Sequence, residues 1–128
     1  SSYDKPMGLW YGFGSSWIDW VESEMPEWKG DYFYFITVNE NKIIRINNFL
    51  DLAVFTERWY DDEKFQVYQQ NRASIRWDDV AKKYSGIEIN PYIPKARYEF
   101  EWYYGWDVAS GCIWKEDAIK SFELIDSK

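Results

Sequence analysis

The chain has 128 residues, a formal net charge of −7, one cysteine and no histidine. This length suits one domain with one core, and a hydrophobic fraction of 46% excludes a disordered chain. Without histidine or a second cysteine, Ser-His-Asp and Cys-His catalysis, an internal disulfide and Cys/His zinc sites are excluded. Acid–base chemistry is left to Glu, Asp, Tyr or Lys.

Charge and aromatic content indicate what the surface can bind. The acidic surplus disfavours non-specific binding to nucleic acid and allows binding to a basic protein. The 9 Trp, 11 Tyr and 8 Phe are too many to bury in one small domain, so some are expected at a surface, a groove or an interface. No run of 18 apolar residues and no signal-peptide pattern occurs, and a single cysteine fits a reducing cytosol, so we expect a cytoplasmic protein.

The first third of the chain predicts strands separated by a helix. Residues 9–13 read as a short strand, and Ser15 or Ser16 is expected to begin a helix that Pro26 ends. Residues 32–39 form a strand that is apolar on both faces, which predicts a central strand covered on both sides. A turn then leads to a strand at 42–46, and the pair is predicted to be a hairpin.

The middle of the chain predicts two further helices. Asn47 or Asn48 caps the first, over residues 49–60. Ser74 is expected to begin the second, whose apolar face has helical spacing and consists of Trp77, Val80, Ala81 and Tyr84.

The last third alternates short strands with turns. Strands are predicted at 87–90, 111–114 and 121–126, and the alternating residues 96–104 read as a long half-buried strand. Residues 91–94 form a loop and 115–119 a helical turn. We therefore predict a single α+β domain over residues 1–128, with a mixed or mainly antiparallel sheet of about six strands and about three helices.

Glu88 is the first candidate site residue, because it is a carboxylate inside the apolar run Gly86-Ile87-Glu88-Ile89-Asn90-Pro91-Tyr92. One interpretation is an edge-strand carboxylate that faces water. The other is an acid held by rigid backbone in an aromatic cleft, where partial burial raises its pKa and suits it to bind or deprotonate a hydroxyl.

The segment Gly8–Ser16 is the second candidate. Its three glycines allow a ligand to approach the backbone, and the following helix offers free N–H groups to an anion. The alternative is an ordinary strand–turn–helix junction. The segment matches neither the dinucleotide GxGxxG pattern nor a phosphate-binding P-loop.

Three other features favour structural roles. Asp107 follows an aromatic cluster, and we expect it to cap or to form an Asx-turn rather than to bind a ligand. Cys112 lies between apolar neighbours, which predicts a buried, unreactive thiol. The acidic run at 61–63 is expected to be a solvated loop and is weak as a metal site.

Four segments carry a resemblance to known proteins. They are Lys5-Pro6-Met7-Gly8-Leu9-Trp10-Tyr11-Gly12, Ser16-Trp17-Ile18-Asp19-Trp20, Tyr84-Ser85-Gly86-Ile87-Glu88-Ile89 and Trp106-Asp107-Val108-Ala109-Ser110-Gly111-Cys112-Ile113-Trp114. The chain resembles a group of small phage and bacterial proteins, and its layout is similar to the minimal ADP-ribosyltransferase fold. In that fold an early strand carries an aromatic residue followed by Ser, and a late strand carries the catalytic Glu.

The resemblance implies roles for particular residues. Tyr11 would stack on the nicotinamide ring of NAD, and Glu88 would bind the nicotinamide ribose hydroxyl and stabilise an oxocarbenium-like transition state. The implied NAD-binding residues are Trp10, Tyr11, Gly12, Ser15 and Ser16. Gly12 departs from the pattern, since many members have Ser there, and the expected His or Arg of a first strand is not visible.

The resulting hypothesis is transfer of ADP-ribose from NAD to a protein or nucleic-acid acceptor, and no metal is expected to take part. The reaction would belong to phage–host conflict and would take place in the host cytoplasm. The alternative is a non-catalytic, acidic, aromatic-rich inhibitor or protein-interaction module, such as a phage anti-defence protein that binds a basic partner. Carbohydrate binding through exposed Trp faces is a third possibility.

Overall fold

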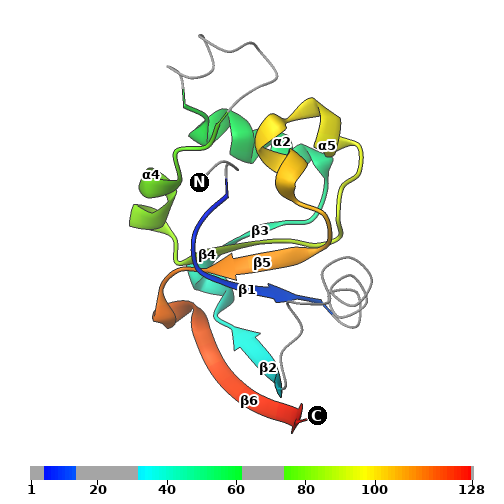
Figure 1. Ribbon diagram of the computed structural model, residues 1–128. Coiled ribbons are helices and arrows are strands. Elements are labelled where there is room, and N and C mark those ends of the chain that lie inside the picture. Colours follow the sequence, from blue (N-terminus) through cyan, green and yellow to red (C-terminus); the bar gives the residue numbers. More distant parts are fainter. Residues whose placement is uncertain (1–4, 14–31, 62–73, 128) are drawn as a thin grey trace.

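The computed structural model describes residues 5–13, 32–61 and 74–127. These residues form two sheets (Figure 1). The larger sheet has the strand order β1-β5-β4-β3, with β1 at Leu9–Gly12, β5 at Ser110–Ile113, β4 at Gly86–Ile89 and β3 at Ile43–Ile46. The smaller sheet is a two-stranded ribbon of β2, Tyr32–Val38, and β6, Ile119–Ser127.

Three α-helices complete the part of the chain that the structure describes. They are α2 at Phe49–Trp59, α4 at Trp77–Lys83 and α5 at Ala96–Glu99. The described residues also form three short 3-10 helices: η2 at Glu40–Lys42 between β2 and β3, η3 at Glu101–Gly105 between α5 and β5, and η4 at Glu116–Ala118 between β5 and β6. The prediction of an α+β fold with six strands and three helices is confirmed. In the described part of the chain, no helix is long and apolar enough to cross a membrane.

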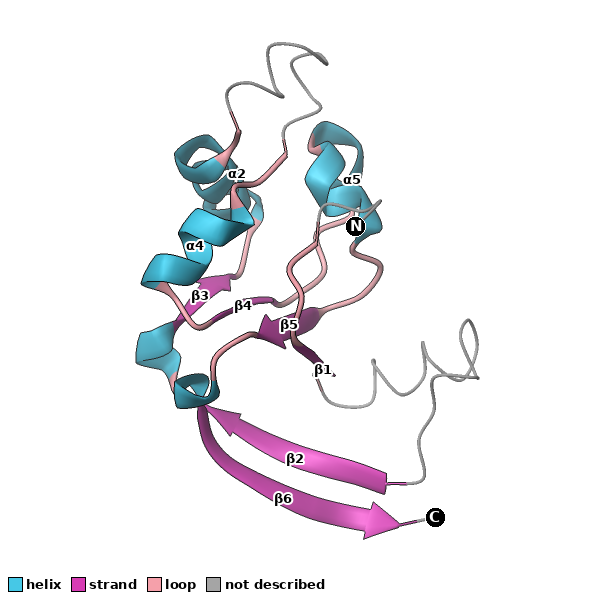
Figure 2. Ribbon diagram, turned by 60° about the vertical axis from the view of Figure 1, so that its left-hand side comes forward, coloured by secondary structure: helices cyan, strands magenta, loops and turns pink. Residues whose placement is uncertain are grey.

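The α-helices lie on one side of the larger sheet, and the ribbon extends away from the other side (Figures 1 and 2). Alternate residues of each strand point to opposite faces. The helical face of the sheet carries Ile46, Ile87 and Ile89, which are at most 1% exposed. They pack in the main core with residues of the helical layer, including Leu52, Phe55, Val80, Trp102 and Trp106.

The first predicted cap is confirmed and the second is wrong. The Asn48 side chain accepts a hydrogen bond from the Asp51 N–H at 2.8 Å and so caps α2. Ser74 does not begin α4, which starts three residues later without a side-chain cap among the described residues. The Ser74 carbonyl instead accepts a bond from the Asp61 N–H, and Ile75 forms an antiparallel bridge with Tyr60. This extended pairing delays the helix.

The predicted hairpin of strands 32–39 and 42–46 is wrong. The strand β2 pairs with β6, and β3 pairs in parallel with β4. The Asn39 N–H donates to the Ala118 carbonyl at 2.7 Å, which ties the end of β2 to the region before β6. The 3-10 helix η2 then carries the chain to the other sheet.

Two predictions about exposed and aromatic segments are also wrong. The strand β2 is not central and covered, because it lies in the ribbon with Phe35 61% exposed. Residues 96–104 form α5 and η3 instead of a strand. The spacing of their aromatic residues also allows a helical path to bury them. Two hydrogen bonds hold the segment in this helical path. The Trp102 Nε1–H donates to Thr56 Oγ1, and the Ile93 N–H donates to Tyr103 Oη.

The other predicted elements are present with bounds shifted by one or two residues. The helix expected after Ser15 or Ser16 lies outside the described residues.

Candidate functional site

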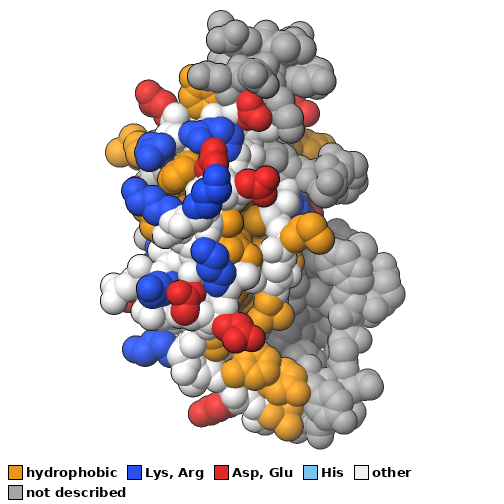
Figure 3. Space-filling model, turned by 90° about the vertical axis from the view of Figure 1, so that its left-hand side faces the viewer, with side chains coloured by type: hydrophobic (Ala, Val, Ile, Leu, Met, Phe, Trp, Pro, Cys, Tyr) orange, Lys and Arg blue, Asp and Glu red, His pale blue; other side chains and the backbone are white. Residues whose placement is uncertain are grey.

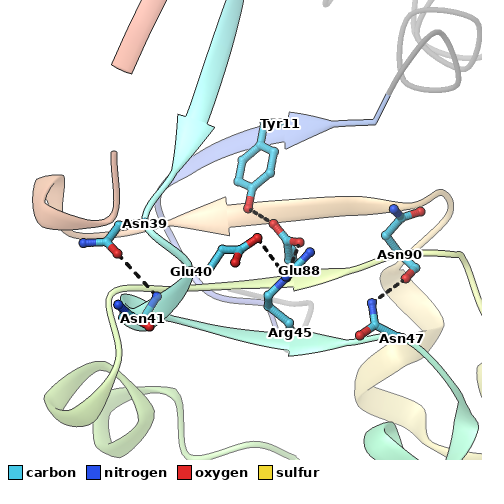
Figure 4. Close-up of polar contacts among 8 residues, drawn as sticks. All are labelled: Tyr11, Asn39, Glu40, Asn41, Arg45, Asn47, Glu88 and Asn90. Atoms are coloured by element: carbon cyan, nitrogen blue, oxygen red, sulfur yellow. Dashed lines mark hydrogen bonds and ion pairs between the residues drawn. The ribbon is translucent and has the colours of Figure 1, made fainter. Parts of the chain in front are cut away.

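One row of residues crosses the larger sheet on the face turned away from the α-helices. Tyr11 of β1 is opposite Gly111 of β5, Gly111 is opposite Glu88 of β4, and Glu88 is opposite Arg45 of β3. Residues directly opposite each other in a sheet point to the same face, so these four share one face. We call this set the Glu88 row; Figure 4 shows the side chains of Tyr11 and Arg45 pointing to the Glu88 carboxylate.

Gly111 makes the contact between Tyr11 and Glu88 possible. A Cβ atom at position 111 would lie 2.3 Å from Tyr11 Cζ and 2.5 Å from its hydroxyl oxygen. The tyrosine ring therefore lies directly over this glycine, in space that any other residue would fill. From there the Tyr11 hydroxyl donates a hydrogen bond of 2.8 Å to Glu88 Oε1.

Arg45 occupies the other oxygen of the carboxylate. Its Nε–H donates to Glu88 Oε2 at 3.0 Å, and its Nη1 lies 2.9 Å from Glu40 Oε1. Glu88 is 3% exposed, whereas the Arg45 side chain is 44% exposed. The carboxylate is thus buried on a central strand and linked to solvent by a guanidinium. The alternative of an edge-strand carboxylate facing water is wrong.

The electrostatics of the row keep Tyr11 protonated and Arg45 charged. Burial raises the pKa of Tyr11 most, and the hydrogen bond to Glu88 raises it further. The hydrogen bond to Glu88 is the main cause of the raised pKa of Arg45, followed by the charge of Glu88 and of Glu40. The carboxylate is therefore held by one neutral and one charged donor, which fixes its orientation.

Of the residues predicted to bind NAD or act on it, the described part of the chain brings together Tyr11 and Glu88. Tyr11 and Glu88 are in contact, but Trp10 belongs to the helical face, where its ring lies 5.0 Å from Trp106. Gly12 is opposite Ser110 and is two residues from Trp10, so it faces the same way as Trp10. Ser15 and Ser16 lie outside the described residues.

Arg45 and Glu40 are the site residues that sequence reasoning missed. A signal was available, because Arg45 is the single charged residue of Ile43–Ile46, as Glu88 is of Gly86–Ile89. Two apolar strands that each carry one charge of opposite sign are candidates for pairing across a sheet.

The structural roles expected for Asp107 and Cys112 differ in outcome. Asp107 forms an ion pair of 3.5 Å with Arg97, and the expected cap or Asx-turn stays a prediction. Cys112 is fully buried on the helical face, and burial raises the pKa of its thiol to about 12, as expected for an unreactive cysteine. Among the described residues, no group of three or more His, Cys, Asp or Glu could hold a metal ion.

Comparison with protein families, with curated proteins and with solved structures found no match to this chain.

Proposed function

We propose that the chain is an ADP-ribosyltransferase-like protein that transfers ADP-ribose from NAD to a macromolecular acceptor. One observation carries the proposal: the hydroxyl of Tyr11 lies 2.8 Å from the carboxylate of Glu88. These are the two residues that the resemblance assigns to the nicotinamide ring and the nicotinamide ribose. Their strands are not neighbours, so the contact depends on the fold and on Gly111 between them.

The reaction needs a carboxylate beside the anomeric carbon of the nicotinamide ribose. The bond from this carbon to nicotinamide breaks, its electron pair leaves with nicotinamide, and the acceptor's nucleophile bonds to the carbon and releases its proton. A fixed negative charge stabilises the oxocarbenium-like state between these steps. Glu88 supplies that charge, and Arg45 holds the carboxylate in one orientation.

The Tyr11 hydroxyl occupies Glu88 Oε1 in this structure, and Glu88 is almost fully buried. Productive binding therefore requires Tyr11 to move from Oε1, so that a ribose hydroxyl donates to the carboxylate in its place. The Tyr11 ring is then free to stack on nicotinamide. A carboxylate accepts about four hydrogen bonds, so Arg45 can remain bound throughout.

The test compares Glu88→Gln with Glu123→Gln, which changes an exposed carboxylate on the ribbon. NAD consumption and incorporation of labelled ADP-ribose are measured for both. Loss of a charge aimed at the transition state should lower the rate by about 100-fold or more, while the control should stay within about twofold of wild type. Wild-type NAD consumption by Glu88→Gln would contradict the proposal.

A second candidate function is that of a non-catalytic module that binds a basic protein through the β2–β6 ribbon. The observation that favours it is the exposure of large apolar side chains there. Tyr34 is 48%, Phe122 51% and Leu124 53% exposed, and the Tyr34 and Phe122 rings stack at 4.6 Å. Figure 3 shows hydrophobic side chains gathered at the ribbon end of the molecule. A net charge of −7 favours a basic partner.

The two functions predict different behaviour of the ribbon. For a binding module, a purified basic partner should form a stoichiometric complex, measured by light scattering after size-exclusion chromatography. Phe122→Ser with Leu124→Ser should abolish the complex. Leu50→Ser, which removes a 70% exposed leucine from α2, should leave it intact. NAD turnover without any stable partner would reject this second function.

A further inference from the structure

A second polar cluster lies on the helical side of the sheet, away from Glu88. It contains Lys5 before β1, Tyr92 between β4 and α5, Arg97 on α5 and Asp107 after η3. Tyr92 packs against the main core, and Lys5 lies over Trp10, which belongs to the same face. We call these four residues the Arg97 cluster.

The Arg97 cluster contains buried donors without acceptors. Three buried polar side-chain atoms of the described residues make no hydrogen bond, and they are Tyr92 Oη, Arg97 Nε and Trp106 Nε1. The first two belong to neighbouring side chains: burial raises the pKa of Tyr92, and both the charge of the Arg97 guanidinium and its approach to the Tyr92 hydroxyl oppose that rise. Arg97 can only donate to the Tyr92 oxygen, so the Tyr92 O–H proton still lacks the acceptor that buried donors almost always have.

Arg97 is held in place by groups that leave its Nε–H free. Its Nη2 lies 3.5 Å from Asp107 Oδ1, and its guanidinium carbon lies 4.7 Å from the centre of the Tyr104 ring. These contacts fix the plane of the guanidinium without using the Nε–H. A second acceptor can therefore bind along the Nε edge, as carboxylates and phosphates commonly do.

The cluster also carries an excess of positive charge in an acidic protein. Lys5 and Arg97 are its two cations, and Asp107 is its carboxylate. The Lys5 ammonium lies 5.4 Å from the centre of the Trp10 ring, and a Cβ added at Gly105 would lie 2.9 Å from its Cε. Burial lowers the pKa of Lys5, which a bound anion would oppose.

We propose that the Arg97 cluster binds the carboxylate or phosphate group of a small anionic ligand. The group accepts hydrogen bonds from Tyr92 Oη and Arg97 Nε, and Lys5 supplies the second positive charge. The site is separated from Glu88 by the sheet itself, because the two clusters lie on opposite faces. It does not depend on the proposed transfer of ADP-ribose.

The test follows the Arg97 Nε–H signal in ¹H–¹⁵N spectra of the full chain. Sodium phosphate and sodium acetate are titrated separately, with sodium chloride at matched ionic strength as the reference. A saturable shift with phosphate alone assigns a phosphate site, and one with acetate alone or with both assigns a carboxylate-accepting site. A shift that is the same in sodium chloride, or that does not saturate, overturns the proposal.

Three variants sharpen the test. Tyr92→Phe keeps the ring and removes one donor, so anion affinity should fall about tenfold, and unchanged affinity overturns the proposal. Arg58→Gln is the matched control, because Arg58 also stacks on an aromatic ring, at 4.3 Å from Trp59. It should bind within about twofold of wild type. Glu88→Gln should also bind normally, so failure of the proposed enzymatic function leaves this result standing.

Discussion

The Glu88 row and the β2–β6 ribbon reverse the usual distribution of residue types. In the row, a carboxylate is 3% exposed on a central strand. In the ribbon, aromatic and aliphatic side chains are about half exposed, including Phe35 at 61%. Soluble domains ordinarily bury the second kind of residue and expose the first. In both regions, residues are therefore placed against the usual burial preference of their type.

The two regions differ in whether other contacts offset the cost of this unusual placement. Glu88 is buried with a hydrogen bond on each oxygen, so the cost of removing it from water is largely offset. Among the described residues, the exposed apolar side chains of the β2–β6 ribbon have no comparable contacts that offset their exposure to water. A two-stranded sheet is also only marginally stable by itself, and exposed apolar side chains weaken it further. Such violations of local rules are expected at functional sites. The row suits chemistry and the ribbon suits contact.

Gly111→Val should give the largest loss of stability. The added side chain would occupy the position of the Tyr11 ring, because even a Cβ lies 2.3 Å from Tyr11 Cζ. Displacing the ring also breaks its bond to Glu88, and overpacking of this kind costs about 2–3 kcal/mol. Urea denaturation measures the loss.

Ser121→Val is the matched control for Gly111→Val, since it adds the same kind of side chain to an exposed ribbon position. It should change the free energy of unfolding by less than about 0.5 kcal/mol. A Gly111→Val protein as stable as wild type would show that the row does not depend on the glycine.

The stability of the row should depend on pH in the alkaline range. The folded pKa of Tyr11 is raised above the ordinary value of 10.0, so the folded state keeps a proton that the unfolded state releases above pH 10. The contribution of Tyr11 to the free energy of unfolding is then fully present below pH 10. It is lost as pH rises further, at about 1.4 kcal/mol per pH unit for one group.

Tyr11→Phe should reduce the alkaline slope of unfolding free energy by the contribution of one group. Tyr92 and Tyr103, whose pKa values burial also raises, supply slope that remains in this variant. Denaturation at several pH values between 9.5 and 11 measures the slope. A variant with the wild-type slope would mean that Tyr11 is not buried against Glu88 in solution.

At neutral pH, Tyr11→Phe should cost about 1 kcal/mol. It leaves Glu88 Oε1 buried without its donor while the ring stays in place over Gly111. Tyr98→Phe is the comparison, because this ring is 76% exposed, and it should stay within about 0.5 kcal/mol of wild type. Equal losses in both variants would remove the distinction between the row and the surface.

The sequence was sufficient to predict those elements whose signals lie within one short segment. The helix α2 and its Asn48 cap follow from spacing and capping within a dozen residues. The pairing of β2 with β6 could not be found this way, because nothing within residues 32–39 identifies a partner more than 80 residues away. Residues 96–104 alternate like a strand, but their tertiary contacts favour a helical path.

The same limit applies to the candidate site. Glu88 and Tyr11 stand out locally, as a charge in an apolar run and an aromatic in a glycine-rich segment. Their contact needs the order β1-β5-β4, which places Gly111 between them, and this order is a property of the whole chain. The resemblance implies that Trp10 binds NAD together with Tyr11, but alternation along a strand sends neighbouring residues to opposite faces.

The ribbon should respond in the opposite way to the row, with the smallest effect on stability. Phe122→Ser should change the free energy of unfolding by no more than about 1 kcal/mol, because the side chain is already 51% exposed and loses chiefly its stacking on Tyr34. If the ribbon binds a partner, the same change should weaken that complex strongly, since exposed aromatic anchors dominate interfaces. Urea denaturation and partner titration measure the two effects separately.

Phe35→Ser tests which face of the ribbon makes the contact. Tyr34 is opposite Leu124 and Ile36 is opposite Phe122, so these four share one face, while Phe35 and Glu123 point to the other. A partner on the Tyr34 and Phe122 face should bind Phe35→Ser normally although Phe35 is the more exposed aromatic. Equal weakening by both changes would mean that the partner surrounds the ribbon. A large loss of stability from Phe122→Ser would mean instead that the ring is covered in solution, and the contrast with Glu88 would no longer hold.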